Sequence, residues 1–357
     1  APRCPSVFSI RSVSASAVGR ALHTLAEGQS LSEVETAAAF DEIMRGDATP
    51  VQVGAVLMAL RVKGETAAEV AGAARALRAA MVALPAANAD ELVDTCGTGG
   101  GRLATFNIST AAALVAAGAG VRIAKHGNRS FTTLCGSADV LEALGVRIEM
   151  PVADMQRTLE RAGIVFMFAP RMHPAIRHVA PVRSELGIGT LMNMIGPLAN
   201  PASAGRQVVG VSDPARLPLM AGALAALGAR HALVVYGEPG MDEISPLGCT
   251  RVLEVDAGRI SEWTIEPAAL RLDGGMPPAL AGGTPEENAR TVVEVLGGQR
   301  RGGARTAVAL NAAAALYVAD RAPSFAAALE LAMRALDDGV GLRALDRLRA
   351  ASAPAGA

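Results

Sequence analysis

The chain has 357 residues, of which 51% are hydrophobic and 19% charged, and its formal net charge is −1. This composition is typical of a globular protein with one large or two moderate domains, and it excludes wholesale disorder. The balanced charge argues against a protein whose main task is to hold nucleic acid or an anionic membrane. Aromatic residues make up only 3% of the chain, which leaves little for a base-stacking or aromatic sugar-binding site.

The cysteines are Cys4, Cys96, Cys135 and Cys249. They form no C-x-x-C pair and histidine is sparse, so neither a zinc site nor a disulfide framework is expected. The longest stretch without a polar side chain is too short to span a bilayer. A reducing, cytoplasmic setting is therefore the expectation.

The first 26 residues contain several arginines and serines but no acidic residue. This mildly resembles an organelle transit segment, but a disordered tail over residues 1–17 is the simpler interpretation. The pattern that follows is helical. Capping boxes predict helix starts at Ser30 with Glu33, Thr49 with Gln52, and Thr66 with Glu69. Apolar residues recur after each box at helical spacing, which predicts a small helical layer without visible chemistry.

After Pro85 the pattern changes to alternating strands and helices. Strands leading into loops or helices are predicted in residues 91–96, 121–130, 146–150, 163–170 and 231–237, with helices at 137–145, 288–296, 306–319 and 324–336. This alternation predicts a mainly parallel α/β sheet, with sites at the carboxyl ends of its strands. A helical stretch over 171–195 interrupts the alternation, and the Gly-, Pro- and Val-rich section 250–285 is expected to hold antiparallel excursions.

Glycines follow the first predicted strand, in GTGGG at residues 97–101. Glycines allow close backbone approach, and their N–H groups can point at an anion, as in phosphate-binding loops. The segment matches neither the P-loop nor the dinucleotide fingerprint, so on its own a tight turn is the simpler interpretation. Asn107, Ser109 and Thr110 open the next helix, where they are expected either to cap it or to bind phosphate or magnesium.

The sharpest cluster is Lys125, His126, Gly127, Asn128 and Arg129, which directly follows a predicted strand. A lysine supplies a point charge for phosphate, and an asparagine can orient a small polar ligand. The alternative is a solvated basic loop. We favour a functional site because so many polar groups gather at one strand end.

Asp242 and Glu243 are adjacent acids after the strand at 231–237. Carboxylate oxygens suit magnesium, which completes its shell with water and substrate phosphates, although adjacent acids are also common in surface loops. Arg183 is explained equally well by an exposed helix face. His173 is explained by capping or packing, and His231 is expected to be structural or exposed.

Taken together, these motifs resemble the anthranilate phosphoribosyltransferase family. The landmarks follow the family order from about residue 18 to 345: DTCGTGG, TFNIST, KHGNRS, GSADVLEALG, FAPRMHPA, VRSELG, GPLANP and GMDEIS. The joint presence of KHGNR, GSAD, HPA and GPLxNP separates the chain from the related pyrimidine-nucleoside phosphorylases. The resemblance implies transfer of the phosphoribosyl group of 5-phosphoribosyl 1-pyrophosphate (PRPP) to the amine of anthranilate, with release of pyrophosphate, in tryptophan biosynthesis.

The resemblance also implies a nucleoside phosphorylase-like fold, usually in a homodimer. A small all-helical domain is expected over residues 18–86, joined by the helical segment 171–195. A larger α/β domain with a mainly parallel central sheet is expected from residues 87–170 and 196–350. The implied cofactor is Mg²⁺, with two ions expected and one of them held loosely. No nucleic-acid or membrane partner is expected.

Residue roles follow from the same resemblance. The residues implied to bind PRPP are Gly97, Gly100, Gly101, Thr105, Asn107, Ser109, Thr110, Lys125, Asn128 and Ser137. Those implied to contact anthranilate are Gly97, Asn128, His173 and Arg183. Magnesium would be held by Ser109, Asp242 and Glu243. Lys125 and His126 are the candidate catalytic residues.

The chain departs from the family pattern at several positions. The family has an acid where this chain has Gly101, and a glycine where it has Arg102. Serines that usually follow KHGNR are replaced by Thr132 and Thr133, and the second arginine of the RxxLGxRT stretch is Gly189. Further changes are Leu134 and Cys135 at usually polar positions, and Tyr236 in place of a histidine. The loss of the acid bears on metal handling, and the other changes bear on rate.

Two alternatives stay open. The first is a phosphoribosyltransferase or phosphorylase of the same fold that acts on another acceptor. Its discriminator is the set Asn128, His173 and Arg183, which is intact and favours anthranilate. The second is a non-catalytic relative that binds nucleic acid. That interpretation expects a basic surplus and loss of the donor residues, and the chain shows neither.

Overall fold

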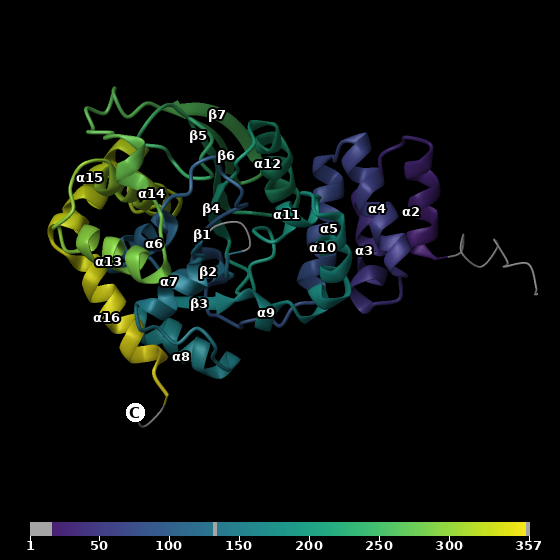
Figure 1. Ribbon diagram of the computed structural model, residues 1–357, viewed down its shortest axis with the longest axis horizontal. Helices are drawn as coiled ribbons and strands as arrows, with labels where there is room; N and C mark the ends of the chain where they lie inside the picture. The colour runs from purple at the N-terminus through teal and green to yellow at the C-terminus, as the bar shows by residue number, and fades with distance from the viewer. Residues whose placement is uncertain (1–15, 131–133, 355–357) are drawn as a thin grey trace, which may run out of the picture.

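The computed structural model describes residues 16–130 and 134–354. The chain forms a bundle of helices beside a larger α/β unit (Figure 1). The expected tail, residues 1–17, lies outside the described residues except for its last two, and Thr132 and Thr133 also lie outside them. No helix in the described ranges is long and apolar enough to cross a membrane.

The bundle contains α2 (Ala17–Ala26), α3 (Glu33–Arg45), α4 (Pro50–Lys63) and α5 (Ala67–Ala79). Helix α3 packs against α5, and α2 packs against both α3 and α4. Their inward faces form a core around Phe40, Leu57 and Leu60, which are fully buried. This layer confirms the helical pattern expected from the sequence.

Two of the three expected capping boxes are confirmed. Thr49 caps α4 with Gln52, and Thr66 caps α5 with Glu69. The box expected at Ser30 with Glu33 is wrong, because α3 begins at Glu33 and is capped by Ser32 with Glu35. Ser32 and Glu35 have the same spacing, and they bond each other's backbone N–H groups reciprocally.

A seven-stranded sheet forms the centre of the α/β unit, in the order β3-β2-β1-β4-β5-β6-β7. The strands are β1 (Val93–Gly97), β2 (Ile123–Gly127), β3 (Ile164–Phe168), β4 (Arg206–Gly210), β5 (His231–Gly237), β6 (Thr250–Asp256) and β7 (Arg259–Ile265). The first five pair in parallel and the last two are antiparallel. The mainly parallel sheet and the antiparallel excursion after residue 250 are therefore confirmed.

One strand prediction is wrong and one strand was not predicted, each for a physical reason. Residues 146–150 are not a strand: Val146, Ile148 and Met150 are buried alternately, but this segment pairs with no strand in the described residues. Strand β4 was not predicted because it opens with Arg206 and Gln207, which are polar and nevertheless buried. An alternating pattern reports burial on one side, and only a hydrogen-bonded neighbour makes it a strand.

Helices cover both faces of the sheet (Figure 1). Helices α6 (Ile108–Gly118) and α14 (Gly303–Val318) contact the sheet on one side, with α13 (Pro285–Leu296), α15 (Phe325–Asp337) and α16 (Val340–Ser352) packed around them. Helix α12 (Leu217–Ala226) contacts β5 and β6 and also joins α5 of the bundle. Neighbouring residues of β4 thus pack into two different hydrophobic cores. Val208 belongs to the core that contains α14, and Val209 belongs to the core shared with the bundle.

Shorter elements complete the fold. They are η1 (Ala89–Glu91), α7 (Ser137–Ala143), α8 (Val152–Ala162), η3 (Pro214–Arg216) and η4 (Pro277–Leu280). The helical stretch expected over 171–195 consists of α9 (Ala169–Met172), η2 (Pro174–His178), α10 (Ala180–Leu186) and α11 (Met192–Ile195). This chain of short helices leaves the end of β3 and packs against α3, α4 and α5. It brings polar side chains of the connection to the carboxyl end of the sheet.

Candidate active site

The carboxyl ends of β1, β4 and β5 meet under one loop, residues 238–245. A Cβ atom at Gly97 would overlap the carboxylate of Asp242, and one at Gly210 would overlap the main chain of Asp242. Glycine at these two strand ends therefore allows the loop to lie directly on the sheet. This close approach places Asp242 and Glu243 above the strand ends, as expected for a parallel α/β fold.

The two carboxylates are partly buried and hydrogen-bonded. Asp242 Oδ2 accepts the N–H of Gly99 at 2.8 Å. Glu243 accepts the N–H of Ser109 at 3.3 Å and the hydroxyl of Thr105 at 3.2 Å. Burial raises the pKa of Asp242. Burial, together with the neighbouring Asp242 charge, raises the pKa of Glu243 to about 8.

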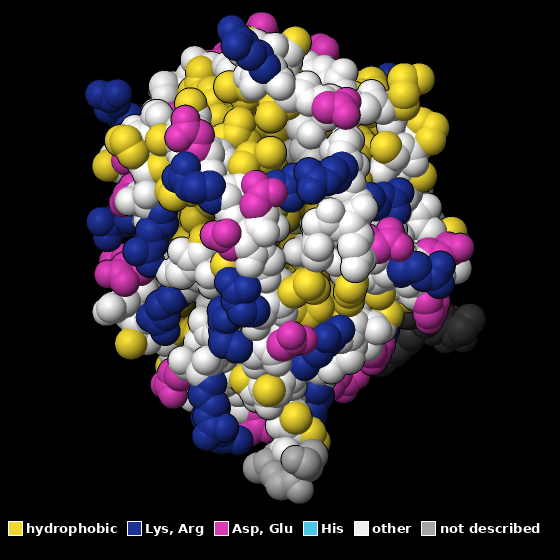
Figure 2. Space-filling model, turned by 90° about the vertical axis from the view of Figure 1, so that its left-hand side faces the viewer, with side chains coloured by type: hydrophobic (Ala, Val, Ile, Leu, Met, Phe, Trp, Pro, Cys, Tyr) yellow, Lys and Arg dark blue, Asp and Glu magenta, His cyan; other side chains and the backbone are white. Residues whose placement is uncertain are grey.

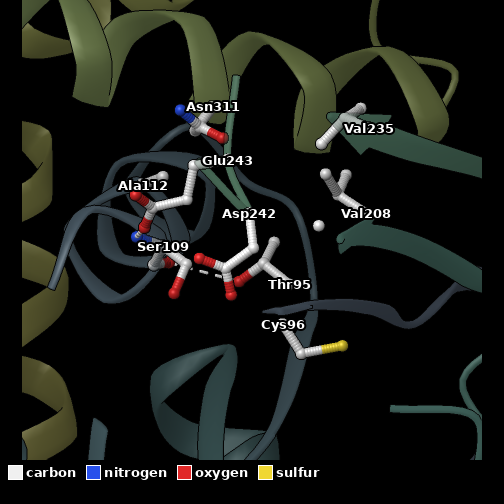
Figure 3. Close-up of a pocket in the computed structure, with 10 residues that line it drawn as sticks. Thr95, Cys96, Ser109, Ala112, Val208, Val235, Asp242, Glu243 and Asn311 are labelled. Carbon is white, nitrogen blue, oxygen red and sulfur yellow. Dashed lines mark hydrogen bonds between the residues drawn. The ribbon is translucent and has the colours of Figure 1, made fainter. Parts of the chain in front are cut away.

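This donor set fits magnesium. Figure 3 shows both carboxylates beside Ser109, so that several oxygen ligands gather in this hollow. A dication here would relieve the cost that burial imposes on two negative charges. Within residues 16–130 and 134–354, no group of three or more His, Cys, Asp and Glu could hold a metal. Two carboxylates and a hydroxyl would give Mg²⁺ a partial shell, which is usual where the ion also binds water and substrate phosphates.

Lys125 brings a positive charge to the same hollow. It extends from β2, is almost fully buried, and donates to the hydroxyl of Ser109 at 3.3 Å and to the carbonyl of Thr95. Burial lowers its pKa, and the negative charges of Asp94 and Glu243 oppose that shift. A cation and two carboxylates thus face one small space, which is the charge pattern needed for a metal-bound diphosphate.

Asp94 is a residue that the motif analysis missed. It is fully buried in β1 and accepts the N–H of His126 at 3.1 Å and the side-chain N–H of Asn200 at 2.7 Å. Burial raises its pKa to about 6, and Lys125 opposes the shift. The sequence does contain a signal for Asp94, which is an acid in the middle of the predicted strand ELVDTC. A buried carboxylate is costly without partners, so an acid at that place indicates that polar groups surround it.

The GTGGG segment is a tight turn tied to the loop of the acids. Gly99 and Gly100 have φ of +70° and +78°, which glycine adopts without strain. The carbonyl of Gly99 accepts the hydroxyl of Ser212 at 3.0 Å, and the N–H of Arg102 donates to Gly240 at 2.9 Å. A side chain at Gly101 would begin 3.3 Å from Asp242 Oδ1. Position 101 therefore faces the carboxylates.

The residues at the start of α6 do not act as ordinary caps. Asn107 occupies the N-cap position without making a capping bond. Its amide instead donates to the carbonyl of Cys135 at 3.3 Å and accepts from Asn288 of α13 at 2.9 Å. Thr110 is buried, and its hydroxyl has no hydrogen-bond partner among the described residues. Asn288, like Asp94, was not anticipated from the sequence.

A second group of polar residues lies where the connecting helices meet the sheet. The rings of His126 and His173 are tilted against each other with centroids 4.9 Å apart. His126 Nε2 and both ring nitrogens of His173 are buried without a partner in the described ranges. Burial lowers the pKa of His126 to about 3 and that of His173 to about 4. Both imidazoles are therefore neutral near pH 7.

Asn128 and Ser137 lie together beyond β2, since the Ser137 hydroxyl donates to the Asn128 carbonyl at 3.3 Å. Arg183 lies on α10, and burial lowers its pKa. Burial is the single cause of that shift, so no charged or hydrogen-bonding partner among the described residues acts on the Arg183 guanidinium. The guanidinium of Arg216 lies 3.6 Å from where a side chain of Gly189 would begin, so a cation remains next to that position.

Other histidines lie outside this site. His231 pairs with Glu254 at 2.8 Å, and Glu254 also accepts from Trp263 and Tyr317. This confirms a structural role for His231. The imidazole of His178 packs over Gly46 in the turn after α3.

Comparison with known proteins matches the two parts of the chain separately. Residues 20–81 match the helical bundle domain of a glycosyl transferase family, and residues 89–342 match its a/b domain. The anthranilate phosphoribosyltransferase of Rubrobacter xylanophilus is 51% identical over 92% of this chain and 95% of its own length. That of Thermomicrobium roseum is 50% identical over 94% and 97%.

Solved structures agree. The anthranilate phosphoribosyltransferase (TrpD) from Thermus thermophilus superposes with a TM-score of 0.88 at 42% identity, over 93% of this chain and 99% of that chain. The Saccharomyces cerevisiae enzyme in complex with PRPP and Mg superposes with a TM-score of 0.84 at 26% identity, over 94% and 97%.

Proposed function

The chain belongs to the anthranilate phosphoribosyltransferase family, and we propose here how its own residues carry out that reaction. The protein transfers the phosphoribosyl group of PRPP to the amine of anthranilate, giving N-(5-phosphoribosyl)anthranilate and pyrophosphate in tryptophan biosynthesis. The observation that carries the residue assignment is the grouping of the partly buried Asp242 and Glu243 with the buried Lys125 around Ser109 at the strand ends. Its charges match a metal-bound pyrophosphate.

The donor lies on the carboxyl ends of β1 and β2. Lys125 supplies a fixed positive charge beside the pyrophosphate, where negative charge grows as the C1–O bond breaks. Its ammonium is already held by Thr95 and Ser109, so little reorganisation is needed. The remaining contacts to phosphate and ribose come from Gly97, Gly100, Gly101, Thr105, Asn107, Ser109, Thr110, Asn128 and Ser137.

Magnesium is held by Ser109, Asp242 and Glu243. The metal supplies electrostatic stabilisation of the leaving pyrophosphate. The chain's carboxylates hold it at the strand ends and exclude water from that side. We assign two ions, the second held loosely because Gly101 contributes no carboxylate next to Asp242.

Anthranilate binds between the sheet and the connecting helices. Arg183 faces the acceptor's carboxylate, because a partly buried guanidinium without an ion-pair partner in the described residues is suited to an anion. His126 and His173 are neutral, so one nitrogen of each ring can accept a hydrogen bond from the amine, which needs to lose a proton as it attacks. Asn128 and the main chain at Gly97 complete the acceptor site, so that the two substrates are held in line.

A homodimer is supported by an apolar stripe on the helical domain. In α4, Val51 and Val62 have 81% and 80% of their surface exposed, and Val34 of α3 has 78%. Residues 51, 55, 58 and 62 have the spacing of one helix face. A second copy of the chain would cover this stripe. A cytoplasmic location, and the domain limits 18–86 with 171–195 and 87–170 with 196–350, belong to the same proposal.

No observation favours a nucleic-acid-binding function. On the face formed by α13, α15 and α16, Lys and Arg side chains are interspersed with Asp and Glu (Figure 2). A nucleic-acid surface would instead carry a stripe of one sign.

The function is tested by following the loss of anthranilate fluorescence with purified protein, PRPP and magnesium. We expect turnover that requires all three components and stops with a chelator. The test includes 4-fluoroanthranilate and a free nucleobase as alternative acceptors. Consumption of the nucleobase with no consumption of anthranilate would overturn the acceptor assignment.

A further inference from the structure

Helix α14 runs beneath the active site and is almost completely buried. Apart from Arg305 and Thr306 in its first turn, its buried side chains are apolar except for Asn311. Figure 3 shows Asn311 reaching from this helix toward Glu243, on the side away from Ser109. A buried amide in an apolar helix is costly unless each of its polar atoms has a partner.

The Asn311 amide is fully satisfied by the chain next to Glu243. Its Oδ1 accepts the N–H of Ile244 at 3.0 Å. Its Nδ2 donates to the carbonyl of Ile244 at 2.9 Å and to the carbonyl of Ala307 at 2.9 Å. Asn311 thus pairs with both main-chain groups of Ile244, in the way that a neighbouring strand would.

The other end of the loop is fixed separately. Met241 and Gly237 exchange main-chain hydrogen bonds of 2.7 and 3.0 Å. Asp242 and Glu243 therefore lie between two pinned points, Met241 and Ile244. Their carboxylates belong to adjacent residues, so two like charges are held close together, and the loop needs this restraint to keep both at one place.

We propose that Asn311 is a positioning residue for the metal site: by clasping Ile244, it holds the carboxylates of Asp242 and Glu243 in the arrangement that binds the magnesium–PRPP complex. This inference rests on the metal role proposed above for Asp242 and Glu243. Asn311 lines the same hollow as Glu243, but all three of its hydrogen bonds go to the main chain of Ile244 and Ala307. It acts through the main chain of Ile244, although its helix, α14, lies about 60 residues further along the chain.

The test separates positioning from simple support of the fold. The variant is Asn311→Leu, which keeps the shape of the side chain but removes all three hydrogen bonds. PRPP binding is measured by calorimetry, once with saturating Mg²⁺ and once with EDTA. We expect PRPP affinity in Mg²⁺ to fall by about tenfold, the equivalent of one to two lost buried hydrogen bonds, and affinity in EDTA to change by less than about twofold.

The matched control is Gln207→Met. Gln207 is a buried amide in β4 that donates to the carbonyl of Pro197 at 2.9 Å, away from the loop of the acids. Its loss is expected to lower thermal stability, as the loss of Asn311 does, but to leave the ratio of the two PRPP affinities unchanged. An equal change of that ratio in both variants would overturn the positioning role.

A second variant covers the case in which Asn311→Leu does not fold. Asn311→Ser is too short to reach both groups of Ile244, and it leaves space in which water can satisfy them. It is expected to give a smaller loss in the same direction. Unchanged PRPP affinity in Mg²⁺ for this folded variant would overturn the inference.

Asp242→Asn tells the two proposals apart. If it loses magnesium-dependent PRPP binding and the Asn311 variants do not, the metal site stands and the positioning role is wrong. If Asp242→Asn itself keeps the full magnesium effect, the metal assignment is wrong and the inference falls with it. In the double variant with Asn311→Leu, the two losses are expected not to add, because both act on one site.

Discussion

The two halves of the proposed active site, one assigned to the donor PRPP and the other to the acceptor anthranilate, are built differently. In the donor half, Asp242, Glu243 and Lys125 each have hydrogen-bond partners within the protein before any substrate binds. In the acceptor half, the nitrogens of His173 are buried without a partner among the described residues, and Arg183 forms no ion pair there. The donor half is preorganised, and the acceptor half holds unsatisfied groups.

This difference follows from where the residues come from. The donor residues lie at the ends of adjacent strands of one sheet, so a single framework fixes them. Two of the proposed acceptor residues, His173 and Arg183, lie in the chain of short helices between β3 and β4, which packs partly on the helical bundle. His126 and Asn128 lie in β2 or just after it. The negative charge that develops on the leaving group is stabilised best by groups whose positions are fixed before the reaction begins. An aromatic acceptor that carries a carboxylate and an amine can itself supply the missing partners when it binds.

The largest loss of activity is expected when the proposed metal ligands are removed from the donor half. Asp242→Asn combined with Glu243→Gln should nearly abolish turnover at ordinary magnesium, because amides are poor ligands for a hard dication. Steady-state rates over a magnesium titration measure the effect.

The matched control is Glu238→Gln, an exposed acid at the start of the same loop, which should retain activity. Near-normal turnover in the double variant would remove Asp242 and Glu243 from the metal site. The segment that carries the two acids would then be a surface turn without a role in metal binding.

Arg183→Ala tests the acceptor half. A guanidinium facing a carboxylate contributes about 1.5–3 kcal/mol, so kcat/KM for anthranilate should fall by the corresponding factor while the KM for PRPP stays nearly constant. Arg177→Ala, on the exposed side of η2, is the control. If both substrates are affected equally, the two halves are not separable in the way the structure indicates.

The unsatisfied histidines predict acid sensitivity. The pKa values of His126 and His173 are lowered by burial to about 3 and about 4 from 6.5 in the unfolded chain. The folded state therefore binds fewer protons, so stability is full above pH 6.5 and is lost as the pH falls toward those values. At pH 5.5 each histidine should lower the free energy of unfolding by about 1.4 kcal/mol relative to neutral pH.

Urea unfolding at pH 7.5 and pH 5.5 measures this loss. His173→Asn should reduce the difference between the two pH values, whereas His23→Gln, on the exposed side of α2, should leave it in place. The comparison between variants cancels the opposite contribution of Asp94, whose pKa is raised. A difference unchanged by His173→Asn would mean that this ring is hydrated in solution.

The contrast between halves also marks what the sequence could predict. Groups in or next to the end of a strand, such as Lys125 in β2 or Asp242 after β5, were visible because topology brings parallel strand ends together. Asn288 and Asn311 reach the site from helices far along the chain. Only tertiary packing brings them there, and no local pattern signals it.

Secondary structure shows the same limit. Helices with strong caps were placed well, as at Thr49 and Thr66. The alternation in residues 146–150 predicted a strand, but burial alone does not supply a partner strand. Strand β4 was missed because its polar Arg206 and Gln207 are buried through long-range hydrogen bonds.

The smallest expected effect is at Gly101, on the border of the donor half. A side chain there would begin 3.2 Å from the carbonyl of Gly240 and 3.3 Å from Asp242 Oδ1, which is close but tolerable with a slight shift. Gly101→Asp should therefore add a carboxylate beside Asp242, raise local metal affinity and move the magnesium optimum downward by a few-fold at most. Excess magnesium, which we expect to inhibit this chain little, should then become more inhibitory.

The control is Gly101→Asn, which has the same shape and no charge and so separates the electrostatic effect from crowding. Because position 101 is tied to the loop of the acids through Arg102 and Gly240, we expect the two magnesium curves to differ. Superimposable curves for Gly101→Asp and the unmodified protein would show that this segment swings away from the donor in solution, and that preorganisation ends at Asp242.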